Sequence, residues 1–193
     1  MVCDTSHNKI ENINLIFMNN QIKYNLTFFL LFCLFIPFSN YAQNGKRKAN
    51  KDTYNWRYEL EVVATGVQGT YQVKVWSYSK RAETAIEQAK KNAVHGIIFR
   101  GFPANGRVQG KKPLSRNPNL EIEHQDYFKD FFAQGGKYLK FVSVVNNGAI
   151  APGDRIKVSK KEYKIGVVIS VDVNSLRKDL EAAGIIKSMS SGF

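Results

Sequence analysis

Apolar and polar residues alternate along two neighbouring stretches of the chain, 56–65 and 70–78. A period of two is typical of a strand with one buried face. The Gly66-Val67-Gln68-Gly69 segment between the two stretches is a turn signal. The pattern therefore predicts a β-hairpin. In the first stretch the apolar face consists of Trp56, Tyr58, Leu60, Val62 and Ala64.

A helical period follows the hairpin. Small apolar residues, mostly alanines, recur at spacings of three and four, so the predicted helix can lie close against the hairpin. We expect Ser79 to cap its N-terminus and Gly96 to end it after His95. Segment 97–99 then predicts a short buried strand. Positive charge would suit the dipole at the predicted C-terminus, which holds Lys90, Lys91 and His95.

Segment 101–119 is rich in glycine, proline, asparagine and basic residues. Its length of about 19 residues exceeds the usual limit of about 12–15 for loops without secondary structure. Loops of this kind are often functional. Its basic residues are Arg107, Lys111, Lys112 and Arg116.

The remaining chain predicts a second helix with an aromatic face, three strands and a last helix. The aromatic face carries Tyr127, Phe128, Phe131 and Phe132. The expected ranges are a helix over 123–134, strands over 137–145, 154–158 and 163–173, and a helix over 174–183. Segment 56–193 thus predicts one α+β domain, with a mainly antiparallel or mixed sheet of about five strands and two to three helices packed on it.

The front of the chain predicts a secretory signal peptide over residues 1–42. The apolar block Leu26–Phe38 is short for a membrane span, which takes roughly 20 residues, but suits a signal-peptide core. Lys23 precedes it, and Ala42 supplies a small residue for cleavage. Met18 lies at a suitable distance to be the true start, so we expect translation to begin there and residues 1–17 to be an over-extended beginning. Segment 43–55 predicts a flexible basic arm.

An alternative keeps the apolar block as a membrane anchor. The basic residues after the block would then hold the domain in the cytoplasm by the positive-inside rule. Lipidation at Cys33 is excluded because bulky Phe32 precedes it. Both cysteines, Cys3 and Cys33, lie in the leader, so the mature chain has no thiol, disulfide or cysteine metal site.

The chain carries a formal charge of +12. The leader holds two basic and two acidic residues, so the exported part keeps the whole excess. This charge suits an anionic surface, either lipid headgroups or a cell-wall polymer; export argues against nucleic acid. A basic, soluble surface with no anionic partner is the plain alternative. The candidate interaction surface combines the aromatic residues Trp76 and Tyr78 with the basic residues Arg107, Lys111, Lys112 and Arg116.

Catalytic signals are weak. His124 lies among acidic residues without a second histidine nearby, and His95 is expected to be a capping or half-buried residue. Glu59 and Glu61 lie about 7 Å apart on one strand face, as glycosidase carboxylates do, but any exposed strand face gives this spacing. No hydrolase, phosphate-loop or dinucleotide motif is present. We expect a non-enzymatic protein with no catalytic, cofactor or metal site.

The hairpin followed by the alanine-rich segment 79–93 resembles small exported domains of bacterial envelopes. Outer-membrane lipoproteins and the N-terminal domain of flagellar assembly accessory proteins share this unit, over 56–100 and 138–173 here. The absence of a lipobox departs from the lipoproteins. The resemblance implies an accessory role, with another envelope protein as partner, in the periplasm or at the outer-membrane periphery. A basic binder of anionic polymer or lipid is the first alternative, and a small hydrolase is the second.

Overall fold

A computed structural model describes residues 56–67 and 69–188. The predicted signal peptide (1–42) and basic arm (43–55) lie outside these residues. All of the described residues belong to one structural unit, so the elements below share a single frame.

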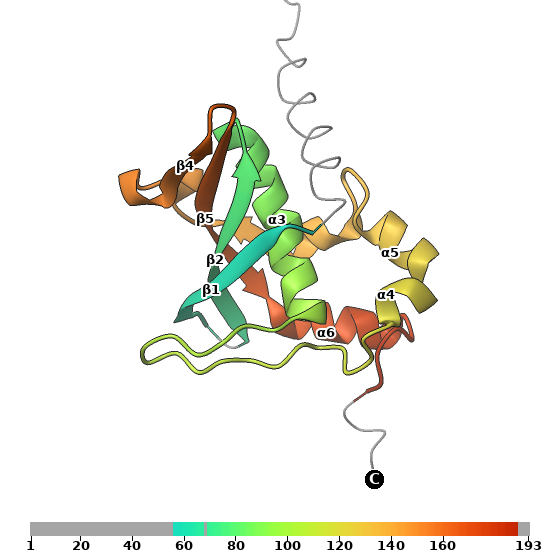
Figure 1. The fold of residues 1–193 in the computed structure, drawn as a ribbon. Helices are drawn as coiled ribbons and strands as arrows, with labels where there is room; N and C mark the ends of the chain where they lie inside the picture. Colours follow the sequence, from blue (N-terminus) through green and yellow to red (C-terminus); the bar gives the residue numbers. More distant parts are fainter. Residues whose placement is uncertain (1–55, 68, 189–193) are drawn as a thin grey trace, which may run out of the picture. The chain divides into compact units, whose positions relative to one another are not determined.

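The core of this unit is an antiparallel sheet of five strands (Figure 1). In chain order they are β1 (Tyr58–Thr65), β2 (Thr70–Ser79), β3 (Val142–Val144), β4 (Arg155–Ser159) and β5 (Glu162–Asp172). β2 lies between β1 and β5, and both β3 and β4 pair with the far edge of β5. The α+β prediction with a mainly antiparallel sheet is therefore confirmed.

β5 organises the sheet. It pairs with β2 over ten residues, from Thr70 opposite Asp172 to Ser79 opposite Tyr163. On its other edge, β3 pairs with the end of β5 and β4 with its beginning. β5 has strand neighbours on both of its edges. Its sequence is the most β-prone of the chain, which suits this central position. Its inward residues Ile165, Val167, Ile169 and Val171 are all buried.

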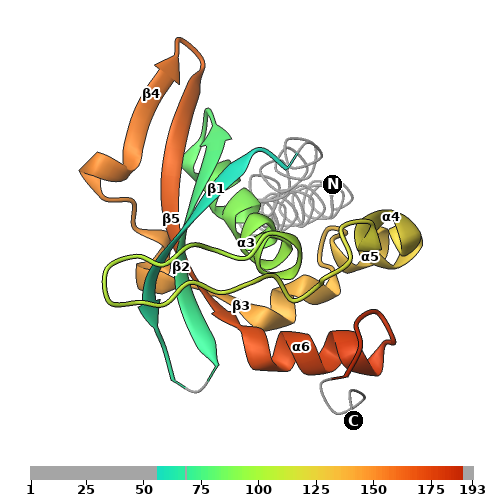
Figure 2. The same ribbon diagram turned by 60° about the horizontal axis from the view of Figure 1, so that its bottom comes forward.

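α3 (Ala82–Phe99) covers the inner face of the sheet (Figure 2). The helix face of small residues is present as predicted, because Ala85, Ala89 and Ala93 are fully buried in the core. The predicted start is wrong: Ser79 belongs to β2, and Arg81 is the N-cap residue. The Ser79 hydroxyl instead accepts a hydrogen bond from the Arg81 backbone N–H.

The predicted helix end at Gly96 and the strand over 97–99 are also wrong. The helix continues through Phe99, and both Ile97 and Ile98 are buried on it. A Cβ atom at Gly96 would overlap the Leu60 side chain of β1. The glycine therefore permits close packing of α3 on β1 instead of ending the helix.

In the second half of the domain, two of the predicted elements have a different secondary structure. The predicted helix over 123–134 is two short helices, α4 (Leu120–Glu123) and α5 (Gln125–Phe131), separated at His124. Most of the predicted strand over 137–145 is a 3₁₀ helix, Lys137–Phe141. In that turn Tyr138 and Phe141 are three residues apart and both buried, so the spacing that governs the segment is three and not two.

The last helix, α6 (Val173–Ala182), begins slightly earlier than predicted. Its N-cap is Asp172, whose side chain accepts a hydrogen bond from the Ser175 backbone N–H. Asn146, Asn147 and Gly148, which follow β3, all have positive φ. Leu176 and Leu180 bury the inner side of α6.

Candidate functional site

The loop over 101–119 joins α3 to α4 and folds back on itself as a narrow hairpin (Figure 1). Two isolated bridges hold its legs together, Phe102 with Lys111 and Asn105 with Val108. Each pair exchanges two backbone hydrogen bonds of 2.9–3.0 Å. The segment predicted as a long loop is thus a loop with a defined internal pairing.

Glycines make this pairing possible. Gly101 has a φ of +67°, and a Cβ atom there would overlap the carbonyl oxygen of Lys111. A Cβ atom at Gly110 would lie 2.6 Å from the backbone nitrogen of Ala104. Only glycine allows the two legs to come this close.

The loop is attached to the sheet through side chains. The Phe102 ring packs on the Tyr71 ring with centroids 5.4 Å apart. The Asn105 side-chain amide donates to the Val62 carbonyl at 3.0 Å. Lys111 reaches over the Tyr71 ring, 4.5 Å from its centroid, and contacts its hydroxyl at 3.4 Å. These contacts fix the loop beside the β1–β2 end of the sheet.

The base of the loop forms an open hollow of about 400 Å³. It is lined by Arg100, Gly101, Phe102, Pro103, Gly110, Lys111, Lys112 and Pro113. Three of these residues are basic and none is acidic. The whole of 101–119 contains no aspartate or glutamate. The hollow and the loop around it therefore carry positive charge alone.

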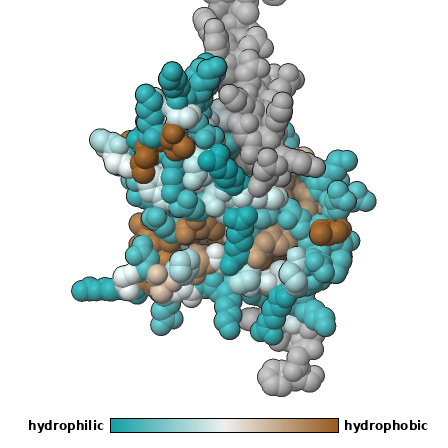
Figure 3. Space-filling model, in the orientation of Figure 1, coloured by the Kyte–Doolittle hydropathy of each residue, from teal (hydrophilic) through white to brown (hydrophobic). Residues whose placement is uncertain are grey.

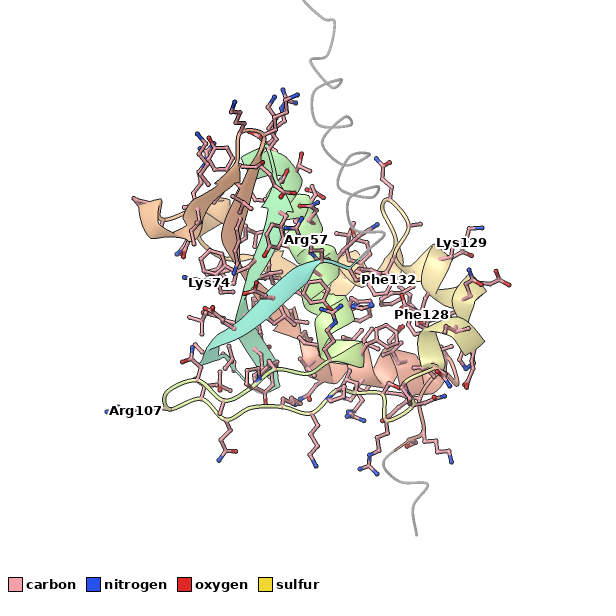
Figure 4. All side chains as sticks on the ribbon, viewed as in Figure 1. Arg57, Lys74, Arg107, Phe128, Lys129 and Phe132 are labelled. Atoms are coloured by element: carbon pink, nitrogen blue, oxygen red, sulfur yellow. The ribbon has the colours of Figure 1, made fainter. Side chains whose placement is uncertain are left out.

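The four basic residues expected from the sequence all belong to this surface, which we call the basic loop (101–119). Arg107, Lys112 and Arg116 are exposed, and Lys111 is half-buried against Tyr71. Arg107 extends from the loop away from the sheet (Figure 4). None of the four forms an ion pair with another described residue.

The aromatic part of the expected surface lies elsewhere, on the outer face of the sheet. Trp76 is only 8% exposed and rests on Gly166 of β5. Its indole N–H donates to Glu61 at 2.9 Å. Tyr78 is half-buried, and the Arg57 guanidinium covers its ring at 3.7 Å. The structure does not bring these aromatics together with the basic loop, and their polar and ring contacts are made within the sheet.

A buried polar cluster surrounds His95, which sequence reasoning treated as a helix-end residue. The His95 ring is 3% exposed and stacks on Trp56 at 3.7 Å. Its Nδ1 lies 2.6 Å from the Tyr58 hydroxyl, and its Nε2 lies 3.2 Å from Glu121. Because the Glu121 carboxylate only accepts, Nε2 carries the hydrogen and Nδ1 accepts from Tyr58. Trp56 also donates to Glu121, at 3.0 Å.

The pKa values in this cluster favour a neutral histidine. Burial lowers the pKa of His95, although its hydrogen bond with Glu121 opposes that shift. The same hydrogen bond lowers the pKa of Glu121. Burial raises the pKa of Tyr58, so its hydroxyl stays protonated. Every polar atom named here has a partner inside the cluster, which joins β1, α3 and α4.

A buried polar seam continues along α3 from this cluster. Lys91 is buried, and burial lowers its pKa to about 8. Its Nζ lies 6.0 Å from the centroid of the Tyr138 ring. The Thr84 hydroxyl and the Gln88 amide oxygen are buried without a hydrogen-bond partner. Lys91 thus lies within the helix, not at its end as expected.

The Glu59 and Glu61 carboxylates are both engaged. Glu59 accepts from Lys164 at 2.6 Å, and this hydrogen bond lowers the pKa of Glu59. Glu61 accepts from the Trp76 indole. A glycosidase acid needs a raised pKa, so the arrangement does not favour that chemistry.

Within 56–67 and 69–188, no group of three or more His, Cys, Asp or Glu side chains is placed to hold a metal ion. His124 lies at the break between α4 and α5 and is half-buried. In the same part of the chain, no helix combines the length and apolar character that a membrane crossing requires.

No protein-family model, curated protein or solved structure matches this chain.

Proposed function

We propose that the protein is a non-enzymatic accessory protein of the bacterial envelope whose basic loop binds an anionic polymer. The observation that carries the proposal is the hollow at the base of the loop, which is lined by three basic residues and no acidic one. Of the three, Lys112 is exposed and has no ion pair with another described residue, so it is available to an external anion. The Arg100 guanidinium also donates to the Trp56 carbonyl at 3.0 Å, and Lys111 rests on the Tyr71 ring. The loop has no internal acid to compete for its cations.

A polymer fits this loop better than a lipid surface. None of the large apolar residues exposed among the described residues lies between 100 and 119. Val108 is half-buried, and Phe102 and Leu114 belong to the core. The loop therefore offers charge and hydrogen-bond donors, but no aliphatic side chain to enter a bilayer. Its extended form suits phosphate or carboxylate groups repeated along a chain.

The export that places this function in the envelope rests on the signal peptide expected over 1–42. Cell fractionation with mass spectrometry of the N-terminus tests it. We expect an envelope fraction in which the chain begins at Gln43. An intact leader with the domain in the cytoplasm would contradict the envelope part of the proposal.

Binding is tested with linear polyphosphate and with polygalacturonate as probes. The triple variant Arg107→Gln/Lys112→Gln/Arg116→Gln should weaken binding by at least about tenfold, because three unpaired cations are lost. A matched control, Lys129→Gln/Lys140→Gln/Lys178→Gln, removes the same charge from exposed positions elsewhere. Equal losses in both variants would show that net charge alone is sensed. Binding of neither probe, with capture of an envelope protein through the loop, would also contradict the proposal.

A further inference from the structure

The β4–β5 hairpin presents an unusual combination of side chains. All five residues of β4 are exposed. Ile156 and Val158 are each 48% exposed, although both are β-branched aliphatics on an edge strand. Figure 3 shows apolar atoms among hydrophilic ones where this hairpin lies.

Uncompensated positive charge lies beside these aliphatics, with Arg155 and Lys157 alternating with them on the other face of the strand and Lys160 and Lys161 in the turn. Within seven residues, 155–161, the hairpin carries four basic side chains and no acidic one. Ser79 pairs with Tyr163, so the next two residues of the chain, Lys80 and Arg81, are close to the hairpin end. Figure 4 shows nitrogen-tipped side chains gathered at this end of the sheet. The four hairpin residues are Arg155, Lys157, Lys160 and Lys161.

Three acidic groups beside the hairpin are already paired, and the exposed Glu83 lies two residues after Arg81. Glu162 binds Arg57 at 3.3 Å, Asp154 binds Lys74 at 2.7 Å, and Glu59 binds Lys164 at 2.6 Å. The four hairpin residues, with Lys80 and Arg81, have no ion pair with any residue of the described chain. The end of the sheet is therefore strongly positive towards solvent.

Protection of an edge strand explains only part of this pattern. Lysines on an exposed edge discourage pairing with other strands. Half-exposed Ile156 and Val158 have the opposite effect, because they favour such pairing. Cations that flank exposed aliphatics are instead the composition of a segment that lies at a lipid interface. Binding of a soluble polyanion would not involve the exposed aliphatic side chains.

We infer that the β4–β5 hairpin is a docking surface for an anionic lipid bilayer, with the turn residues Lys160 and Lys161 at the headgroups and Ile156 and Val158 at the acyl boundary. The inference uses residues different from those of the basic loop, so the two proposals stand or fall separately.

The position of the hairpin suits both proposals together. Ile156 pairs with Lys164 near the beginning of β5. The basic loop contacts Tyr71, which pairs with Val171 at the other end. Seven residues of strand correspond to about 23 Å. The hairpin and the loop occupy opposite ends of the sheet (Figure 1). A lipid-bound hairpin therefore holds the loop away from the bilayer.

Hydrogen exchange of the full chain, read peptide by peptide, tests the inference. A local readout is needed because the apolar segment Leu26–Phe38 can itself bind lipid. With vesicles of 70% phosphatidylcholine and 30% phosphatidylglycerol, exchange in 155–161 should slow by about tenfold or more. Pure phosphatidylcholine vesicles and soluble polyphosphate should leave it unchanged. Equal protection by either of these, or none by the anionic vesicles, would overturn the inference.

Two variants separate the contributions of the aliphatics and the cations. Ile156→Ser/Val158→Ser should abolish the protection although all charges remain. Lys160→Glu/Lys161→Glu should raise the vesicle concentration needed for half-maximal protection by at least about 25-fold, since each cation near an anionic surface contributes roughly fivefold to the binding constant. The controls Ile122→Ser and Lys129→Glu/Lys140→Glu, at exposed positions elsewhere, should keep it. Unchanged protection in the hairpin variants, or equal loss in the controls, would refute lipid docking.

Discussion

The hydroxyl of Tyr58 donates a hydrogen bond of 2.6 Å to Nδ1 of His95, and this bond joins β1 to α3 inside the core. The Nε2 atom of His95 in turn donates a hydrogen bond to the Glu121 carboxylate. Three segments that are distant in sequence thus meet at one neutral imidazole. The arrangement has the form of a catalytic relay, but its burial and complete internal pairing give it a structural role.

The first prediction concerns acid stability. The pKa of His95 is lowered in the folded protein, so below about pH 6.5 the unfolded chain binds a proton that the folded protein does not. The free energy of unfolding should therefore fall as the pH drops from 7 to 5. His95→Gln should be less stable at pH 7 and show a shallower fall. His124→Gln is the matched control and should keep the wild-type profile. Denaturant unfolding of each variant between pH 5 and pH 7 measures the stability at pH 7 and its fall with pH.

Removing the Tyr58 hydroxyl tests the same bond at constant pH. Tyr58→Phe leaves the His95 Nδ1 buried and unpaired, which should cost about 1–3 kcal/mol of unfolding free energy. Tyr163→Phe is a suitable control, because Tyr163 is half-buried and its described contact is with Arg155 over the ring face. A loss no larger than in the control would contradict the assigned role.

A second pH dependence has its origin at Lys91. Its pKa is lowered to about 8, so between about pH 8 and its ordinary value the unfolded chain binds more protons than the folded protein. The charged amine therefore destabilises the fold at neutral pH. Lys91→Met should stabilise the protein at pH 7, and the gain should shrink towards pH 10.5. Lys129→Met, at an exposed position, should show no such trend in unfolding experiments.

Close packing at Gly96 gives a stability prediction with an internal check. Gly96→Ala gains about 1 kcal/mol in helix propensity but forces Leu60 aside, and overpacking costs about 1–3 kcal/mol. We expect a net loss. Leu60→Ala should cost less in the Gly96→Ala background than in the wild type. Gly153→Ala, where a Cβ atom meets nothing within 4 Å, is the control. Additive effects would contradict the packing assignment.

Trp76 should behave as a packed residue and not as a docking residue. Trp76→Ala removes a covered indole and its hydrogen bond with Glu61, so we expect a loss of about 3–5 kcal/mol. Tyr78→Ala should cost clearly less because Tyr78 is half-buried. Thermal and denaturant unfolding measure both. A stable Trp76→Ala variant with weakened partner binding would restore the docking interpretation.

The sequence was sufficient for elements whose own periodicity determines them. The hairpin, the strand over Glu162–Asp172 and the alanine face of α3 follow directly from alternation or helical spacing. It failed where a partner from elsewhere decides the outcome. From the sequence, Gly96 indicates the end of a helix, whereas in the structure it makes room for the Leu60 side chain. From the sequence, Lys137–Phe141 is predicted as a strand. In the structure it is a 3₁₀ helix that buries two aromatic residues three positions apart.

The candidate site divides in the same way. The four basic loop residues were predictable, because glycine, proline and uncompensated charge are local properties of 101–119. The hollow needs the pairing of Phe102 with Lys111, which no local pattern indicates. The covering of Trp76 depends on Glu61 and Gly166 from the two flanking strands, so alternation along β2 alone made it look available.

The salt dependence of polyphosphate binding tests the basic loop most directly. The logarithm of the binding constant should fall linearly with the logarithm of the salt concentration in the wild type. Arg107→Gln/Lys112→Gln/Arg116→Gln should make that slope shallower by about 2–3, since each of the three lost contacts accounts for roughly 0.7–0.9. The Lys129→Gln/Lys140→Gln/Lys178→Gln control should keep the wild-type slope. An unchanged slope in the loop variant would contradict the assignment of the basic loop as the binding site.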